Sequence, residues 1–275
     1  MTFHGNILVV NSSFYRGNYM SKAEQQNFHR RLRKGNQGAL KVVSKDDLLK
    51  VFTTTNIIKE FLNGEKHTLT PLGYAISING QYGIQATLDA ARVKNALKEV
   101  LTTASTSIEF PNGIIKHTLT PLGYAIGTNS QRSINAILDA ARAGNILKEV
   151  LTTAGASVEF LHGIKHILTP LSYAIGTNNQ QSINAILNAA RAGNILKEVL
   201  TTAGASVEFP NGKKYTIAPL SHAVSINNQQ SIGTILDVAR VENMLKEVLI
   251  TVNANVEFPN GEKRAIIPLG PCYRY

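Results

Sequence analysis

One stretch of 21 residues, Ala140 to Phe160, occurs again letter for letter from Ala189 to Phe209. Prolines at equivalent positions are 50, 49, 49 and 49 residues apart: Pro71, Pro121, Pro170, Pro219 and Pro268. Self-similarity at a fixed period of roughly 20–50 residues is the sequence signature of repeat architectures. The sequence therefore predicts about four full units, with degenerate partial units acting as caps at both ends.

Each unit contains three helical patterns, and in one unit they cover residues 120–129, 133–144 and 145–155. Thr120 followed by Pro121 is typical of a helix N-cap and first helical residue. Ser133 and Asn145 are the expected caps of the second and third helices, and Gly144 is the expected end of the second. Because each helix is only about three turns long, we expect its stability to come from packing against neighbouring helices.

The rest of each unit, as in "SVEF" and "IKHTL", alternates β-branched residues on both sides of a turn. The turn holds an Asn-Gly or His-Gly pair, in which glycine readily adopts positive φ. These segments are expected to be β-hairpins whose tips line up along one edge, with plain extended loops as the alternative. The tips are Asn63-Gly64, Asn112-Gly113, His162-Gly163, Asn211-Gly212 and Asn260-Gly261.

Two motifs resemble the ankyrin repeat, which carries T-P-L-H-x-A at the start of its first helix and G-A-x-V-N after its second. The first motif stands at 70–76, 120–126 and 169–175, and weakens to "APLSHAV" at 218–224. The second stands as "GASVEF" at 155–160 and 204–209. The 49-residue period exceeds the ankyrin period of 33, which fits one extra helix per unit. A three-helix armadillo- or HEAT-like unit is the rival interpretation.

Either interpretation predicts an all-α helical repeat solenoid with short β-hairpins or loops along one edge. We expect a basic segment over 1–45 and the repeat domain over 46–275. The ankyrin resemblance implies a non-enzymatic, monomeric scaffold that binds another protein through its hairpin tips or concave helix surface. Because such arrays are frequent in proteins that intracellular bacteria deliver into eukaryotic hosts, the resemblance also implies an effector role.

One repeat position forms a row of polar and aromatic residues that are candidate partner contacts, and three hairpin tips join them as candidates. They are His67, His117, His166, Tyr215 and Arg264 in the row, with Asn112, Asn211 and Asn260 at the tips. The alternative is a structural histidine that bonds a neighbouring loop in each unit. A shared metal is not expected, because ligands must converge on one ion and one residue per unit, about 10 Å apart, cannot.

The charge of the chain is uneven, because residues 1–45 hold eight Lys or Arg and one acid in a protein of net charge +10. Within this segment, Arg30, Arg31, Arg33 and Lys34 form a basic cluster. Nucleic-acid binding through residues 16–45 is therefore the alternative function, with the repeats as a platform. A solvated basic helix is the structural explanation of the same cluster.

Further sequence features limit the classes of function and the compartments that we expect. No phosphate-binding glycine loop, H-E-x-x-H motif or nucleophile elbow is present, so neither an enzyme nor a cofactor is expected. Cys272 is the single cysteine, which fits a reducing, cytoplasmic compartment. We expect neither a membrane span nor a secretory signal. The recurring Asp–Arg pairs, such as Asp139 and Arg142, and the Lys and Glu of each "LKEV" are interpreted as surface residues without a binding role.

Overall fold

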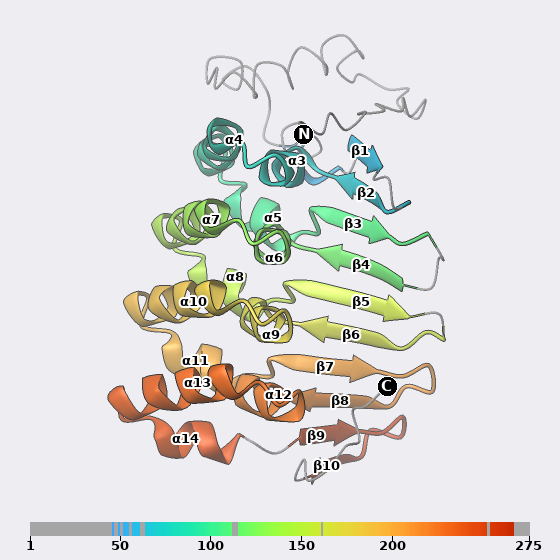
Figure 1. The fold of residues 1–275 in the computed structure, drawn as a ribbon, viewed down its shortest axis with the longest axis vertical. Helices are drawn as coiled ribbons and strands as arrows, with labels where there is room; N and C mark the ends of the chain where they lie inside the picture. The colour runs from blue at the N-terminus through green and yellow to red at the C-terminus, as the bar shows by residue number, and fades with distance from the viewer. Residues whose placement is uncertain are drawn as a thin grey trace. The chain divides into compact units, whose positions relative to one another are not determined.

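The computed structural model describes residues 46, 49, 52–54, 57–60, 64–111, 115–160, 162–251 and 254–266 (Figure 1). These residues fall into two compact units that divide between Gly144 and Asn145. Unit 1 comprises the described residues up to Gly144, and unit 2 those from Asn145 onward. The basic cluster of residues 30, 31, 33 and 34 and the tip residue Asn112 lie outside the described residues.

The elements follow one repeating order: two strands, then helices of 7, 13 and 6 residues. Unit 1 contains β1 (Ile57–Glu60), β2 (Lys66–Leu69), α3 (Pro71–Ser77), α4 (Gln81–Val93), α5 (Leu97–Thr102), β3 (Thr106–Glu109), β4 (Ile115–Leu119), α6 (Pro121–Gly127) and α7 (Gln131–Ala143). Unit 2 contains α8 (Leu147–Thr152), β5 (Ala156–Phe160), β6 (Lys165–Leu168), α9 (Pro170–Gly176), α10 (Gln180–Ala192), α11 (Leu196–Thr201), β7 (Ala205–Glu208), β8 (Lys214–Ile217), α12 (Pro219–Ser225), α13 (Gln229–Val241), α14 (Leu245–Ile250), β9 (Ala254–Glu257) and β10 (Lys263–Ile266).

The first helix of each repeat begins where the sequence predicts. In α6 the Thr120 side chain accepts a hydrogen bond from the backbone N–H of Gly123 at 3.3 Å, and Pro121 is the first helical residue. Thr70 makes the same bond to Gly73 in α3 at 3.2 Å. A threonine oxygen here satisfies one of the backbone donors that a helix N-terminus leaves without an intrahelical partner.

Of the predicted ends of the other two helices, Gly144 is confirmed as the C-cap of α7, whereas the N-caps predicted at Ser133 and Asn145 are wrong. Ser133 does not cap the second helix, because it lies inside α7 and is fully buried. Gly144 keeps a φ of −87°, whereas Asn145 adopts a φ of 54° and separates α7 from the third helix, which starts at Leu147. Asparagine tolerates this left-handed conformation better than most residues, because its short side chain can hydrogen-bond locally. Among the described residues, eight asparagines share it: Asn79, Asn95, Asn129, Asn145, Asn178, Asn194, Asn227 and Asn243.

The prediction of an all-α solenoid is wrong, because the extended segments form antiparallel sheet alongside the helices. In unit 1 the strand order is β1-β2-β3-β4, and in unit 2 it runs from β5 to β10 in sequence order. Strands pair within each hairpin and also between successive hairpins, as β2 with β3, β6 with β7 and β8 with β9. An isolated hairpin leaves unpaired backbone groups on its outer edges, and the next repeat supplies partners for them.

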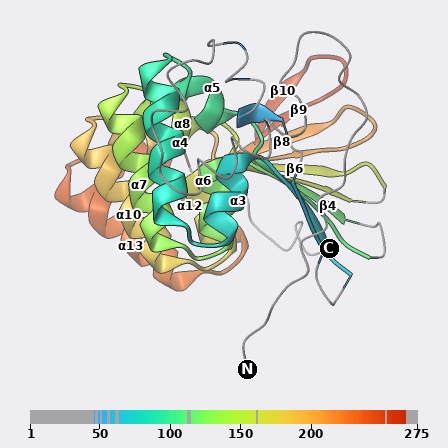
Figure 2. The ribbon, with the colours of Figure 1, turned by 90° about the horizontal axis from the view of Figure 1, so that it is seen from above.

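In each unit the helices gather on one side and the strands extend away from them (Figure 2). The core lies among the helices: Ile134, Ile137 and Leu138 of α7 are at most 3% exposed, and α7 packs against α4 and α6. The pairing of β7 with β8 continues just before β7, where the Gly204 N–H donates to the Ile217 carbonyl at 2.7 Å. No helix of the described residues is both long and apolar enough to cross a membrane.

Candidate partner-binding face

Alternation along the unit 2 strands separates two faces of different chemistry. One row places each residue directly opposite the next: Val158, His166, Val207, Tyr215, Val256 and Arg264. Together with Phe160, Phe209 and Phe258 these residues are called the aromatic face. The opposite row, called the charged face, alternates in sign: Glu159, Lys165, Glu208, Lys214, Glu257 and Lys263. The repeat thus brings His166, Tyr215 and Arg264 to one row, as the sequence suggests.

Each polar member of the row packs against a phenylalanine. The ring centroids of Phe160 and His166 are 5.1 Å apart, and those of Phe209 and Tyr215 are 5.6 Å apart, both in edge-on geometry. Edge-on contacts of this kind are favourable because the positive edge of one ring meets the negative face of the other. All four rings are half-buried, so each pair leaves part of its surface for a partner.

Cations gather at the end of the aromatic face nearest β10. The Lys213 ammonium lies 4.8 Å from the centre of the Tyr215 ring and 5.2 Å from that of Phe258. The Arg264 guanidinium lies 5.5 Å from the Phe258 centre and donates to Glu262 at 2.6 Å. Sequence reasoning missed Lys213, which immediately precedes β8, although continued alternation from Tyr215 would place it on the same side.

His67 in unit 1 occupies the same repeat position in a different environment. It is 8% exposed, its Nδ1 lies 3.2 Å from the Tyr124 hydroxyl, and its Nε2 lies 3.9 Å from the Glu65 carboxylate. Burial lowers the pKa of His67, and burial together with the Glu65 charge raises the pKa of Tyr124 to about 12. His67 is therefore positioned as a structural residue. His117 remains half-buried and packs on Phe110, with ring centroids 5.2 Å apart.

A second histidine, His222, borders the aromatic face from helix α12. It stands where the other repeats have Tyr74, Tyr124 and Tyr173. Burial and, to a smaller extent, the neighbouring His166 lower the pKa of His222 to about 4, and a hydrogen bond with the Ser172 backbone opposes this shift. Its buried Nδ1 has no hydrogen-bond partner among the described residues. The change from Tyr to His is the only sequence signal that could have pointed to it.

The described tip residues shape their own turns. The side-chain oxygens of Asn211 and Asn260 accept hydrogen bonds from the backbone N–H groups of Lys213 and Glu262, each at 3.0 Å. The glycines after them have φ of 80° and 82°. Side chains that bond their own backbone two residues on stabilise turns, so these asparagines have a local structural role whether or not a partner reaches them.

The charged residues of the recurring Asp–Arg pairs and of the "LKEV" segments form ion pairs both within a repeat and between successive repeats. Arg142 pairs with Asp139 at 3.2 Å within its own helix, as expected. Arg191 instead reaches Glu242 of the following repeat at 2.6 Å. The "LKEV" lysines do the same, because Lys148 pairs with Glu198 at 2.9 Å and Lys197 with Glu247 at 3.2 Å. These exposed charges link successive helices of unit 2, a role that a single-repeat interpretation did not reveal.

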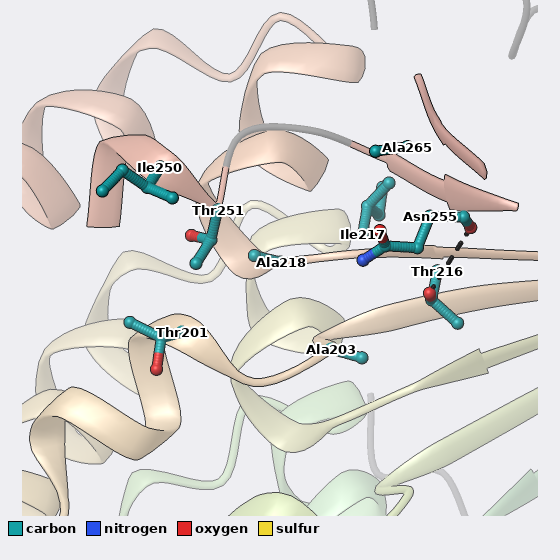
Figure 3. A pocket seen from close by; sticks show the side chains of 9 residues that line it. All are labelled: Thr201, Ala203, Thr216, Ile217, Ala218, Ile250, Thr251, Asn255 and Ala265. Carbon is teal, nitrogen blue, oxygen red and sulfur yellow. Dashed lines mark hydrogen bonds between the residues drawn. The ribbon is translucent and has the colours of Figure 1, made fainter. Parts of the chain in front are cut away.

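A hollow of about 240 Å³ lies between α11, β8 and the end of α14, and Figure 3 shows the side chains that line it. Its lining consists of neutral side chains, namely threonines, alanines, isoleucines and Asn255, with the Thr216 hydroxyl donating to the Asn255 carbonyl at 3.5 Å. It therefore offers no pair of acid and base groups. Within the described ranges, no three His, Cys, Asp or Glu side chains gather as a metal site would require.

No protein-family model matches the sequence, and no curated protein matches it either. The ankyrin resemblance stays a prediction, carried by the two short motifs alone.

Proposed function

We propose that the protein is a non-enzymatic binding module that holds an extended segment of another protein on the aromatic face of unit 2. The observation that carries this proposal is the presence of two half-buried ring pairs, Phe160 with His166 and Phe209 with Tyr215, on one side of the strands. Aromatic residues and arginine are enriched in protein interfaces, where they contribute much of the binding energy.

The spacing of the pairs indicates the kind of segment that fits. His166 and Tyr215 lie on β6 and β8, with β7 between them. Because neighbouring strands are about 4.7–4.9 Å apart, the pairs repeat about every 9–10 Å. A polyproline II segment advances about 3.1 Å per residue with three residues per turn, which gives about 9.3 Å per turn. A partner in this conformation, crossing the strands, would present one side chain to each ring pair.

The charged face supports the assignment of binding to the other side. Lys214 lies 2.7 Å from Glu208, and Lys263 lies 3.7 Å from Glu257. Charges that are already paired gain little by meeting a partner and must first be desolvated to do so. Ring pairs that remain half-exposed instead gain from the burial of their apolar surface.

Selection of displayed random peptides on the full chain tests this function. A variant with Phe209→Ser and Tyr215→Ser removes one ring pair from the aromatic face. A matched control with Ser206→Ala and Thr216→Ser changes the same two hairpin strands on the opposite face. We expect peptides enriched on the native protein to lose binding to the first variant and to keep it on the control, with both variants folded by circular dichroism. Failure to enrich any peptide, or equal binding to both variants, would contradict the proposal.

A further inference from the structure

Lys213 distinguishes one hairpin from all the others. The equivalent positions carry Glu65, Ile115, Ile164 and Glu262, so a cation stands here in this repeat alone. Lys213 immediately precedes β8, which lies between β7 and β9 (Figure 1). The turn fixes its backbone, because the Lys213 N–H donates to Asn211 and its carbonyl accepts from Phe209 at 2.9 Å.

Two adjacent lysines of this hairpin make different contacts. Lys214 points to the charged face and pairs with Glu208. Lys213 points to the aromatic face, where its ammonium lies over the rings of Tyr215 and Phe258. Within the described ranges Lys213 forms no ion pair, and the nearby Arg264 already has Glu262 at 2.6 Å. Lys213 is therefore the cation of the aromatic face that has no carboxylate of its own in the described part of the chain.

The chemistry of this arrangement favours an anion. An ammonium has three N–H donors, and ring faces attract its charge without supplying a carboxylate-strength acceptor. A carboxylate that approached Lys213 would form a charge-assisted hydrogen bond. The half-buried rings beside it exclude water, which strengthens the attraction between the two charges.

We propose that Lys213 anchors an Asp or Glu side chain of the extended protein segment bound on the aromatic face. This inference rests on the function proposed above and adds the charge of the partner to it. The partner is then an acidic extended segment whose carboxylate lies at Lys213 and whose neighbouring apolar side chains contact the ring pairs.

The test uses the peptides selected on the full native chain. The tightest acidic peptide and its version with Glu replaced by Gln are titrated by fluorescence anisotropy. Three proteins are compared: the native chain, Lys213→Met, and the matched control Lys214→Met on the charged face. We expect the native chain and Lys214→Met to prefer the acidic peptide by roughly tenfold, in line with hydrogen bonds to charged groups. We expect Lys213→Met to bind both peptides equally.

The outcomes separate this inference from the proposed function. If peptides are selected but show no preference for the acid, or if Lys213→Met keeps the preference, the anchoring role is overturned while peptide binding on the aromatic face stands. If the native chain selects no peptide, the proposed function fails and the inference fails with it. Thermal melts of the three proteins should coincide, because both lysine side chains lie at the surface of the strands.

Discussion

On the charged face of unit 2 every lysine in the row has a glutamate directly across from it, whereas on the aromatic face cations and histidines lie against rings. The first arrangement satisfies its own charges and favours one strand register, because a shift by one residue would turn these charges onto the aromatic face. The second leaves ring edges and an ammonium able to accept further contacts. The charged face thus helps to hold the strands together, and the aromatic face is the one to which we assign binding.

The largest difference between the faces should appear in acid. His222 borders the aromatic face, and its pKa of about 4 in the folded protein lies below the ordinary value of 6.5. As pH falls through 6.5, the unfolded chain takes up a proton first, so stability present at neutral pH is lost between about pH 6.5 and pH 4. The free energy of unfolding should fall by roughly 3 kcal/mol over this range from this group.

Urea titrations of the native chain and of His222→Tyr at pH 7 and pH 4.5 check this prediction. Tyrosine is the residue of the other repeats at this position and does not titrate in this range. We therefore expect the variant to lose clearly less stability on acidification. An equal loss in both proteins would show that His222 is not the group responsible, and His166, whose pKa is also lowered by burial, would be examined next.

The smallest effect is expected on the charged face. Glu208→Gln removes the ion pair with Lys214, whose two side chains are 37% and 38% exposed. Exposed ion pairs contribute only about 0–1 kcal/mol, so the free energy of unfolding should change by less than about 1 kcal/mol, and peptide binding should not change. If Glu208→Gln also bound peptide more weakly than the native chain, the charged face would take part in binding. That result would contradict the division between the two faces.

Much of the helical part of the repeat could be predicted from local sequence. Thr120 and Pro121 mark a helix start by chemistry that operates within four residues, and the structure confirms it. The exact end of the second helix was harder to predict, because Gly144 and Asn145 are both residues that commonly end helices. Only the structure shows that Asn145 is the one with positive φ. No packing role was predicted for Gly204, yet a Cβ atom there would lie 2.4 Å from the Ser172 hydroxyl of the preceding repeat.

The strands show why pattern alone was insufficient. Alternation identifies "SVEF" and "IKHTL" as extended, but it is the same for a free hairpin and for a hairpin joined to its neighbours. Pairing of β6 with β7 depends on how repeats stack, which is not local information. For the same reason His67 and His166 look equivalent in sequence, although Tyr124 faces the first and His222 the second.

The most direct test of the central claim uses the absence of tryptophan from the chain. Tyr215→Trp places a single fluorescent reporter on the aromatic face, and Thr216→Trp places one on the opposite face of the same strand. Addition of a selected peptide should shift the emission of the Tyr215→Trp protein to shorter wavelength, because the bound segment excludes water from the indole. The Thr216→Trp emission should stay unchanged. A shift at position 216 alone, or bound peptide with no shift at position 215, would contradict binding on the aromatic face.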